Sequence, residues 1–162
     1  MTIQARRIAP APIRKTLRVK TTPEKAFHVF TGGMGGWWMK SHSLLASPQA
    51  DVVVEPRAGG RWFETGEDGS EMDWGRVLAW DPPSRVVLAW QLTADWAYDP
   101  DFETTVEVTF TADGAETVVA FEHRDLERYG DRAEELRGGY ESGMEGGWGA
   151  LLEGFRSVAE AD

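Results

Sequence analysis

Apolar and polar residues alternate through much of this chain, which is the pattern of β-strands with one buried face. The first such segment, residues 13–20, sets Ile13, Leu17 and Val19 among basic side chains. Further strands are predicted at residues 50–56, 59–66, 71–83, 84–92, 104–111 and 116–123. Short turns such as residues 112–115 join most of them, so we expect hairpins and an antiparallel sheet.

Two segments follow the helical period instead. Residues 23–31 come after Thr22, a good N-cap, and begin with Pro23, whose fixed φ suits a first helical turn. From Tyr140 onward, apolar residues recur at helical spacing: Met144, Trp148, Leu151, Leu152, Phe155 and Val158. One residue earlier lies a stripe of small residues: Gly143, Gly147, Ala150 and Gly154. This stripe either permits close approach to the sheet or leaves empty volume beside the bulky residues.

An antiparallel sheet with one amphipathic helix at its C-terminal end is an α+β arrangement. The motifs PEKAFHVFT, GGWW, VEPRAGGRWFE, WGRVLAWDPPSRVVLAW, FEHRDLE and GGWGALLEGF occur in this order. With them the chain resembles the START-like superfamily (SRPBCC, Bet v 1-like), and within it the branch of the homologues of the activator of Hsp90 ATPase. The resemblance runs from Ile13 to the end, which predicts one domain over residues 13–162 and a flexible tail over residues 1–12.

The resemblance implies a helix-grip fold with a hydrophobic internal cavity. In that fold, six to seven antiparallel strands wrap around the long C-terminal helix, and two short helices follow the first strand. The glycine-rich stretch 31–43 would then form the second short helix at the cavity mouth. Adjacent side chains on a helix diverge by about 100°, so we expect one of Trp37 and Trp38 to plug the core and the other to face the cavity.

His123 and Glu64 are the candidates for acid–base chemistry in such a cavity. His123 shares the inward face of its strand with Val119 and Phe121, where it could act as a general base, anchor a ligand or bind a metal. It could equally be a buried histidine satisfied by hydrogen bonds. Glu64 would have a raised pKa if it faced the cavity, whereas on the surface it would pair with an arginine across neighbouring strands.

Large aromatic residues dominate the predicted cavity, because eight tryptophans are many for 162 residues. Whether Trp74 and Trp80 face inward depends on register, since a bulge near Gly75 would exchange their faces. The predicted rim consists of His42 and Trp96. The predicted cavity residues are Trp37, Trp38, Trp62, Glu64, Trp74, Trp90, Phe121, His123, Tyr140, Met144 and Trp148.

Composition excludes several classes of function. The net charge of −10 argues against a nucleic-acid-binding face, and the absence of cysteine excludes disulfides and thiolate chemistry. His28, His42 and His123 lack the spacing of a metal site, and no cofactor-binding fingerprint occurs, so no cofactor is predicted. No stretch of about 18 apolar residues and no signal peptide are present, so neither a membrane span nor export is expected, and a cytoplasmic location follows by default.

Three functions fit these observations. The first, which the aromatic residues favour, is binding of a small hydrophobic or aromatic molecule between the sheet and the C-terminal helix. The second is a cavity enzyme of the cyclase, aromatase or hydrolase kind that uses His123 and Glu64. The third is a co-chaperone-like protein–protein module, which the single domain disfavours because the eukaryotic activators carry an additional N-terminal domain. Exposed glycine-rich helix surface would further support a homodimer.

Overall fold

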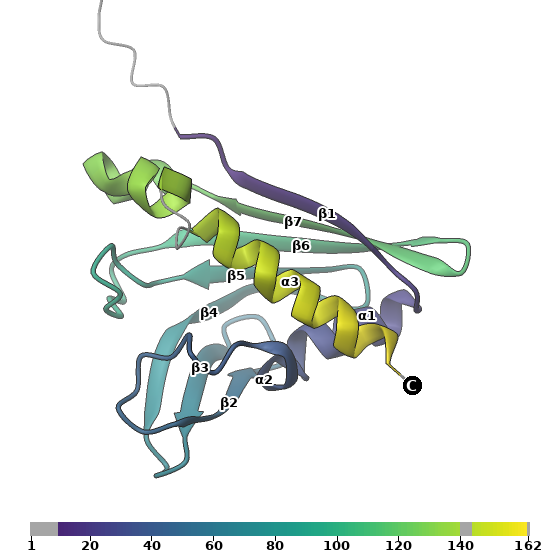
Figure 1. Cartoon of the computed structure of the whole chain (residues 1–162), viewed down its shortest axis with the longest axis horizontal. Helices are drawn as coiled ribbons and strands as arrows, with labels where there is room; N and C mark the ends of the chain where they lie inside the picture. The colour runs from purple at the N-terminus through teal and green to yellow at the C-terminus, as the bar shows by residue number, and fades with distance from the viewer. Residues whose placement is uncertain (1–9, 140–143, 162) are drawn as a thin grey trace, which may run out of the picture.

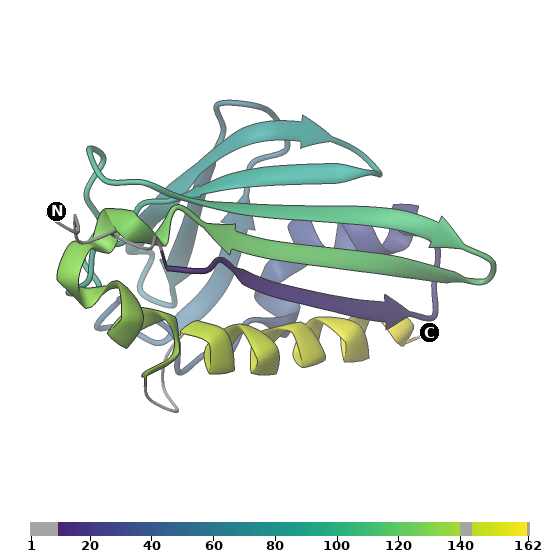
Figure 2. The ribbon, with the colours of Figure 1, turned by 90° about the horizontal axis from the view of Figure 1, so that it is seen from above.

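Seven antiparallel strands form one curled sheet in the order β1-β7-β6-β5-β4-β3-β2 (Figure 1). The computed structural model describes residues 10–139 and 144–161, so most of the expected tail lies outside the described residues. The strands are β1 (Ile13–Val19), β2 (Gln49–Val54), β3 (Arg61–Gly66), β4 (Glu71–Asp81), β5 (Arg85–Trp90), β6 (Thr104–Asp113) and β7 (Glu116–Arg124). Helix α3 (Met144–Glu160) crosses the concave side of the sheet, which confirms the α+β helix-grip prediction (Figure 2).

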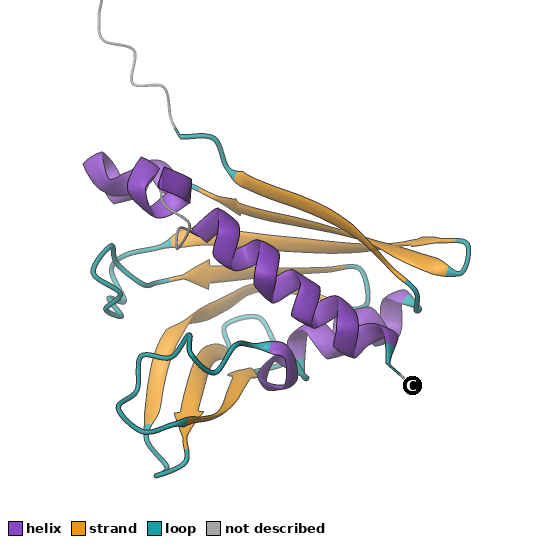
Figure 3. Cartoon of the chain, viewed as in Figure 1, coloured by secondary structure: helices purple, strands orange, loops and turns teal. Residues whose placement is uncertain are grey.

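Two short helices, α1 (Pro23–Thr31) and α2 (Met34–Trp37), follow the first strand as expected (Figure 3). The hydroxyl of Thr22 accepts a hydrogen bond from the backbone N–H of Lys25 at 3.2 Å, so it caps α1. On its apolar face, Phe27 packs edge-on against Trp80 at 5.0 Å between ring centroids. Helix α1 therefore closes one end of the core between the sheet and α3.

Bulges in β4 decide where its tryptophans point. Trp62 pairs with Gly75 and Phe63 with Asp73, which leaves Trp74 as the extra residue of a bulge. A second irregularity follows between Val77 and Ala79. Each bulge exchanges the two faces of a strand, so the pair of bulges restores the alternation. Trp74 and Trp80 consequently both face the helices, Trp74 against Trp38 and Trp80 against Phe27.

Gly75 is required by this bulge. A Cβ atom at Gly75 would lie 1.7 Å from the carbonyl oxygen of Ala89 on the neighbouring strand. No side chain fits at that distance, so glycine allows β4 and β5 to stay paired while Trp74 turns inward.

Of the two roles expected for the small residues of α3, the structure shows open volume at Gly147, and at Gly154 it shows close approach to another helix. A Cβ atom at Gly147 would meet no atom within 4 Å, whereas one at Gly154 would lie 3.1 Å from the carbonyl oxygen of Trp37. Gly147 therefore leaves open volume, and Gly154 permits close approach to α2 rather than to the sheet. Gly143 and Tyr140 lie outside the described residues.

The acidic segment after β7 forms two short helices, η1 (Leu126–Arg132) and η2 (Glu135–Gly139). One side of this segment is buried through Leu126, Tyr129 and Leu136. The hydroxyl of Tyr129 donates to the carbonyl oxygen of Leu92 at 2.8 Å and so holds the β5–β6 connection in place. No described helix is long and apolar enough to cross a membrane.

Candidate ligand-binding site

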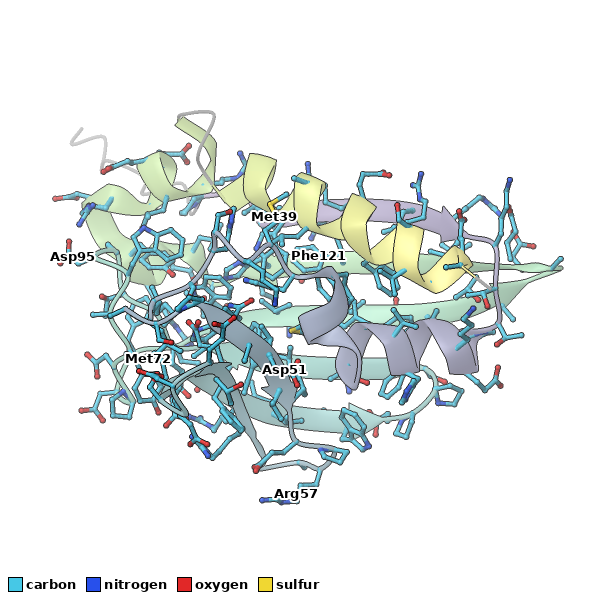
Figure 4. The ribbon with its side chains drawn as sticks, turned by 60° about the horizontal axis from the view of Figure 1, so that its bottom comes forward. Met39, Asp51, Arg57, Met72, Asp95 and Phe121 are labelled. Atoms are coloured by element: carbon cyan, nitrogen blue, oxygen red, sulfur yellow. The ribbon has the colours of Figure 1, made fainter. Side chains whose placement is uncertain are left out.

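A cavity of about 420 Å³ lies between the loop after α2, the end of β5 with the loop that follows it, and the N-terminal half of α3. Pockets of this size bind small organic molecules in many proteins. In Figure 4, side chains crowd the space between α3 and the sheet, with Asp95 at the outer edge of the β5–β6 connection. The lining residues are Trp38, Ser41, His42, Ser43, Leu44, Trp74, Trp90, Leu92, Trp96, Gly147, Trp148 and Leu151.

Five tryptophans line the cavity and contact one another. Trp38 lies 4.8 Å from Trp74 and 5.7 Å from Trp148 between ring centroids. Trp90 in turn lies 5.6 Å from Trp148 and 6.2 Å from Trp96. Tilted and edge-to-face contacts of this kind stabilise aromatic clusters, so the wall is built from rings that hold one another in place.

The adjacent tryptophans after α1 have the two different roles that were expected. Trp37 points into the core, where its ring packs against Phe30 at 5.1 Å and Phe155 at 5.7 Å. Its indole N–H donates to the carbonyl oxygen of Val29 at 2.9 Å. Trp38 instead lines the cavity. Trp37 is therefore the core plug, and its place in the predicted cavity is corrected.

Glu64 lies beneath the cavity wall and is fully buried. Its carboxyl oxygens accept hydrogen bonds from the backbone N–H of Leu44 at 2.9 Å, the indole N–H of Trp74 at 2.8 Å, and the side chains of Ser43 and Gln49. Neither expectation for this residue describes the arrangement, because Glu64 has no arginine partner among its contacts and does not line the cavity. It anchors the wall loop to β3.

His123 is fully buried behind the wall. Its Nδ1 accepts a hydrogen bond from the indole N–H of Trp148 at 3.1 Å, and its Nε2 lies 2.8 Å from the hydroxyl of Thr104. Burial lowers the pKa of His123 to about 3, against an opposing effect of the negative charge on Asp125. The ring is therefore neutral, with its proton on Nε2, and it supports Trp148 from behind, which favours the structural interpretation of this histidine.

Two other residues of the predicted cavity, Trp62 and Phe121, lie in the second layer. The indole N–H of Trp62 donates to the sulfur of Met34 at 3.3 Å, and the ring of Phe121 packs on Trp148 at 4.5 Å. Alternation correctly placed both on the inner face, but other tryptophans cover them. Tyr140 lies outside the described residues, as does the side chain of Met144.

Both predicted rim residues, His42 and Trp96, line the cavity. Trp96 has a φ of 60°, a left-handed conformation that costs a non-glycine residue roughly 1–2 kcal/mol. The turn that holds it is closed by a 2.9 Å hydrogen bond from its own N–H to the carbonyl oxygen of Thr93, and Arg132 pairs with the adjacent Asp95 at 2.6 Å. The fold thus holds an exposed aromatic ring in a strained position at the mouth.

Sequence reasoning missed the wall residues that lie in loops. Ser41, Ser43 and Leu44 belong to an irregular segment, where no periodicity indicates which side faces inward. Leu92 lies just beyond β5, which ends at Trp90, although the predicted strand ran to residue 92. For Gly147 a signal did exist, because unfilled volume was one of the two explanations of the small-residue stripe. Among the described residues, no group of three metal-ligating side chains lies together.

The family model for Activator of Hsp90 ATPase homolog 1-like protein (AHSA1) matches residues 20–160. The chain belongs to the AHSA1 family. Among solved structures, it is 34% identical to Txn09, an anthrahydroquino-γ-pyrone synthase complexed with SUM, over 93% of this chain and 97% of that one, with a TM-score of 0.63. No protein with a curated description matches the chain.

Two further AHSA1-like structures extend the comparison. CalC from Micromonospora echinospora, a self-sacrificing resistance protein, is 29% identical over 92% of this chain and 94% of that one, with a TM-score of 0.65. The Aha1 dimer from Colwellia psychrerythraea is 17% identical over 93% of this chain and 96% of that one, with a TM-score of 0.62. At 17% identity the Aha1 likeness concerns the fold alone.

Proposed function

We propose that this protein binds a small hydrophobic molecule with a planar aromatic ring system in the tryptophan-lined cavity. The observation that carries the proposal is the wall itself, in which five indole rings surround a space of about 420 Å³. Aromatic faces bind flat apolar rings through stacking and edge-to-face contacts. The likeness to a synthase named for a polycyclic aromatic product supports the same ligand class.

The arrangement of polar groups favours binding over catalysis. A cavity enzyme needs an acid or base within hydrogen-bonding reach of the reacting group. His123 and Glu64, the two candidates, lie behind the wall with their polar atoms engaged by neighbouring residues. A cyclase, aromatase or hydrolase activity remains the alternative, and turnover that is lost in His123→Ala while the fold survives would support it.

A substitution that fills the cavity tests the binding proposal. Gly147→Leu places a helix-compatible side chain where no atom lies within 4 Å of the Cβ position. The matched control is Ala150→Leu, because Ala150 is exposed on the same helix and does not line the cavity. Both variants are titrated with a panel of two- and three-ring aromatic compounds while tryptophan fluorescence is recorded.

We expect saturable quenching in the wild type and in Ala150→Leu, and loss of saturation in Gly147→Leu. Equal quenching in all three proteins would place the ligand elsewhere and overturn the proposal.

The co-chaperone alternative predicts instead that the protein captures a heat-shock ATPase in a pull-down. The expected homodimer is checked by light scattering of the purified chain.

A further inference from the structure

The polar side chains of the cavity are confined to one short segment. Of the twelve lining residues, only Ser41, His42 and Ser43 carry a polar group outside an indole ring. The others are tryptophan, leucine and glycine. A ligand in this cavity therefore meets an apolar surface on most sides and hydrogen-bonding groups at one end.

Most of the remaining polar atoms already have protein partners. The indole N–H groups of Trp38, Trp74 and Trp148 donate to His42, Glu64 and His123 respectively. The hydroxyl of Ser43 donates to Glu64 and accepts from the backbone N–H of Leu45 at 3.2 Å. Among the described lining side chains, unused hydrogen-bonding capacity remains on the buried indole N–H of Trp90, which has no partner, and on Ser41 and His42.

Ser41 and His42 form a pair at the mouth. The hydroxyl oxygen of Ser41 lies 3.1 Å from Nδ1 of His42. Within the described part of the chain, Nε2 of His42 has no hydrogen-bond partner. The pair thus presents one ring nitrogen and one hydroxyl, and each of these groups can donate or accept according to the tautomer.

Contacts on both sides of this pair fix its backbone. The indole N–H of Trp38 donates to the carbonyl oxygen of His42 at 2.9 Å, and the N–H of His42 donates to the carbonyl oxygen of Met39 at 2.9 Å. Two residues later, the N–H of Leu44 donates to the buried Glu64 at 2.9 Å. A loop held at three points loses little entropy when it binds, so the polar pair is preorganised.

The wall also restricts the charge of the ligand. No lysine, arginine, aspartate or glutamate occurs among the described lining residues. A charged group on the ligand would therefore be transferred from water into the cavity with no oppositely charged side chain beside it, which is unfavourable. The polar group that the pair receives should therefore be neutral. A hydroxyl or carbonyl oxygen on an aromatic ring has this chemistry.

We infer that Ser41 and His42 form a subsite for a neutral oxygen substituent, so that the ligand class is a hydroxylated or carbonyl-bearing planar aromatic molecule. The inference rests on the proposed function and adds the polar end of the ligand to it. The oxygen substituent exchanges hydrogen bonds with Nε2 of His42 and the hydroxyl of Ser41 while the rings contact the tryptophans.

The test compares 2-naphthol with 2-methylnaphthalene, which have the same ring system and differ in one polar group. Dissociation constants for both are measured by calorimetry in the wild type and in the double variant Ser41→Ala/His42→Phe. We expect the ratio of the two constants to shift by about tenfold against naphthol in the variant, while the affinity for methylnaphthalene stays within about twofold. His28→Phe, an exposed site on α1, is the control and should leave the ratio unchanged.

Each result bears on a separate claim. If neither compound binds the wild type, the proposed function fails as well as the inference. If both bind and the ratio is the same in wild type and double variant, or if the variant weakens both equally, the polar subsite is wrong while the cavity stands. Ser41→Ala/His42→Gln, which restores a donor and an acceptor, should recover part of the preference for naphthol.

Discussion

Alanine substitutions at Gly147 and Gly154 should have opposite consequences although both lie inside α3. Replacing an interior helical glycine with alanine stabilises a helix by about 1 kcal/mol. At Gly147 the new methyl group meets no atom within 4 Å, so the protein should keep the whole gain. At Gly154 the methyl carbon would lie 3.1 Å from the carbonyl oxygen of Trp37, and overpacking costs roughly 1–3 kcal/mol.

We therefore expect Gly147→Ala to be about 1 kcal/mol more stable than wild type, and Gly154→Ala to be unchanged or up to about 2 kcal/mol less stable. Urea denaturation followed by circular dichroism measures both free energies of unfolding. In thermal melts of a chain this long, 1 kcal/mol corresponds to a shift of about 2–4 °C. An equal gain at both positions would refute the close approach of α3 to α2.

Further predictions concern buried and strained residues. The pKa of His123 is about 3 in the folded state and about 6.5 in the unfolded state. Between about pH 6.5 and pH 3 the unfolded chain therefore binds more protons than the folded chain, so the free energy of unfolding falls as the pH is lowered through this range. Urea melts at several pH values should show a smaller pH dependence in His123→Gln than in wild type. Glu64→Ala leaves several buried donors without an acceptor and should cost about 3–5 kcal/mol, whereas Glu64→Gln keeps one acceptor and should cost about 1–2 kcal/mol, as measured by the same melts. Because Trp96 has a positive φ, Trp96→Gly should be about 1 kcal/mol more stable than Trp96→Ala in thermal denaturation, and the reverse order would contradict the left-handed conformation.

The strands and helices could be predicted from the sequence because their signals are local. Short alternating or apolar runs bounded by turn residues identified all seven strands, and the cap at Thr22 located the start of α1. The direction of Trp74 could not be read in this way. It depends on bulges in the pairing of β4 with its two neighbours, and next to Trp74 the chain needs glycine because the carbonyl oxygen of Ala89 lies against Gly75.

The site was harder to predict because its walls come from segments far apart in the chain. Alternation placed His123 on the inner face and left the face of Glu64 open, and the role of each residue depends on what covers it. Trp148 lies 25 residues from His123 and donates to it, and Ser43 lies 21 residues from Glu64 and donates to that carboxyl group. Such partners follow from the folded topology, and periodicity within one strand does not indicate them.

The eight tryptophans allow the binding of an aromatic ligand in the cavity to be tested residue by residue. A ¹H–¹⁵N spectrum resolves one indole N–H signal for each, and a titration with 2-naphthol reports which rings meet the ligand. Binding in the cavity predicts the largest shifts for Trp38, Trp74, Trp90, Trp96 and Trp148, while Trp80, packed on Phe27 away from the cavity, stays in place. A saturable shift at Trp80 with the five cavity signals unmoved would contradict the account.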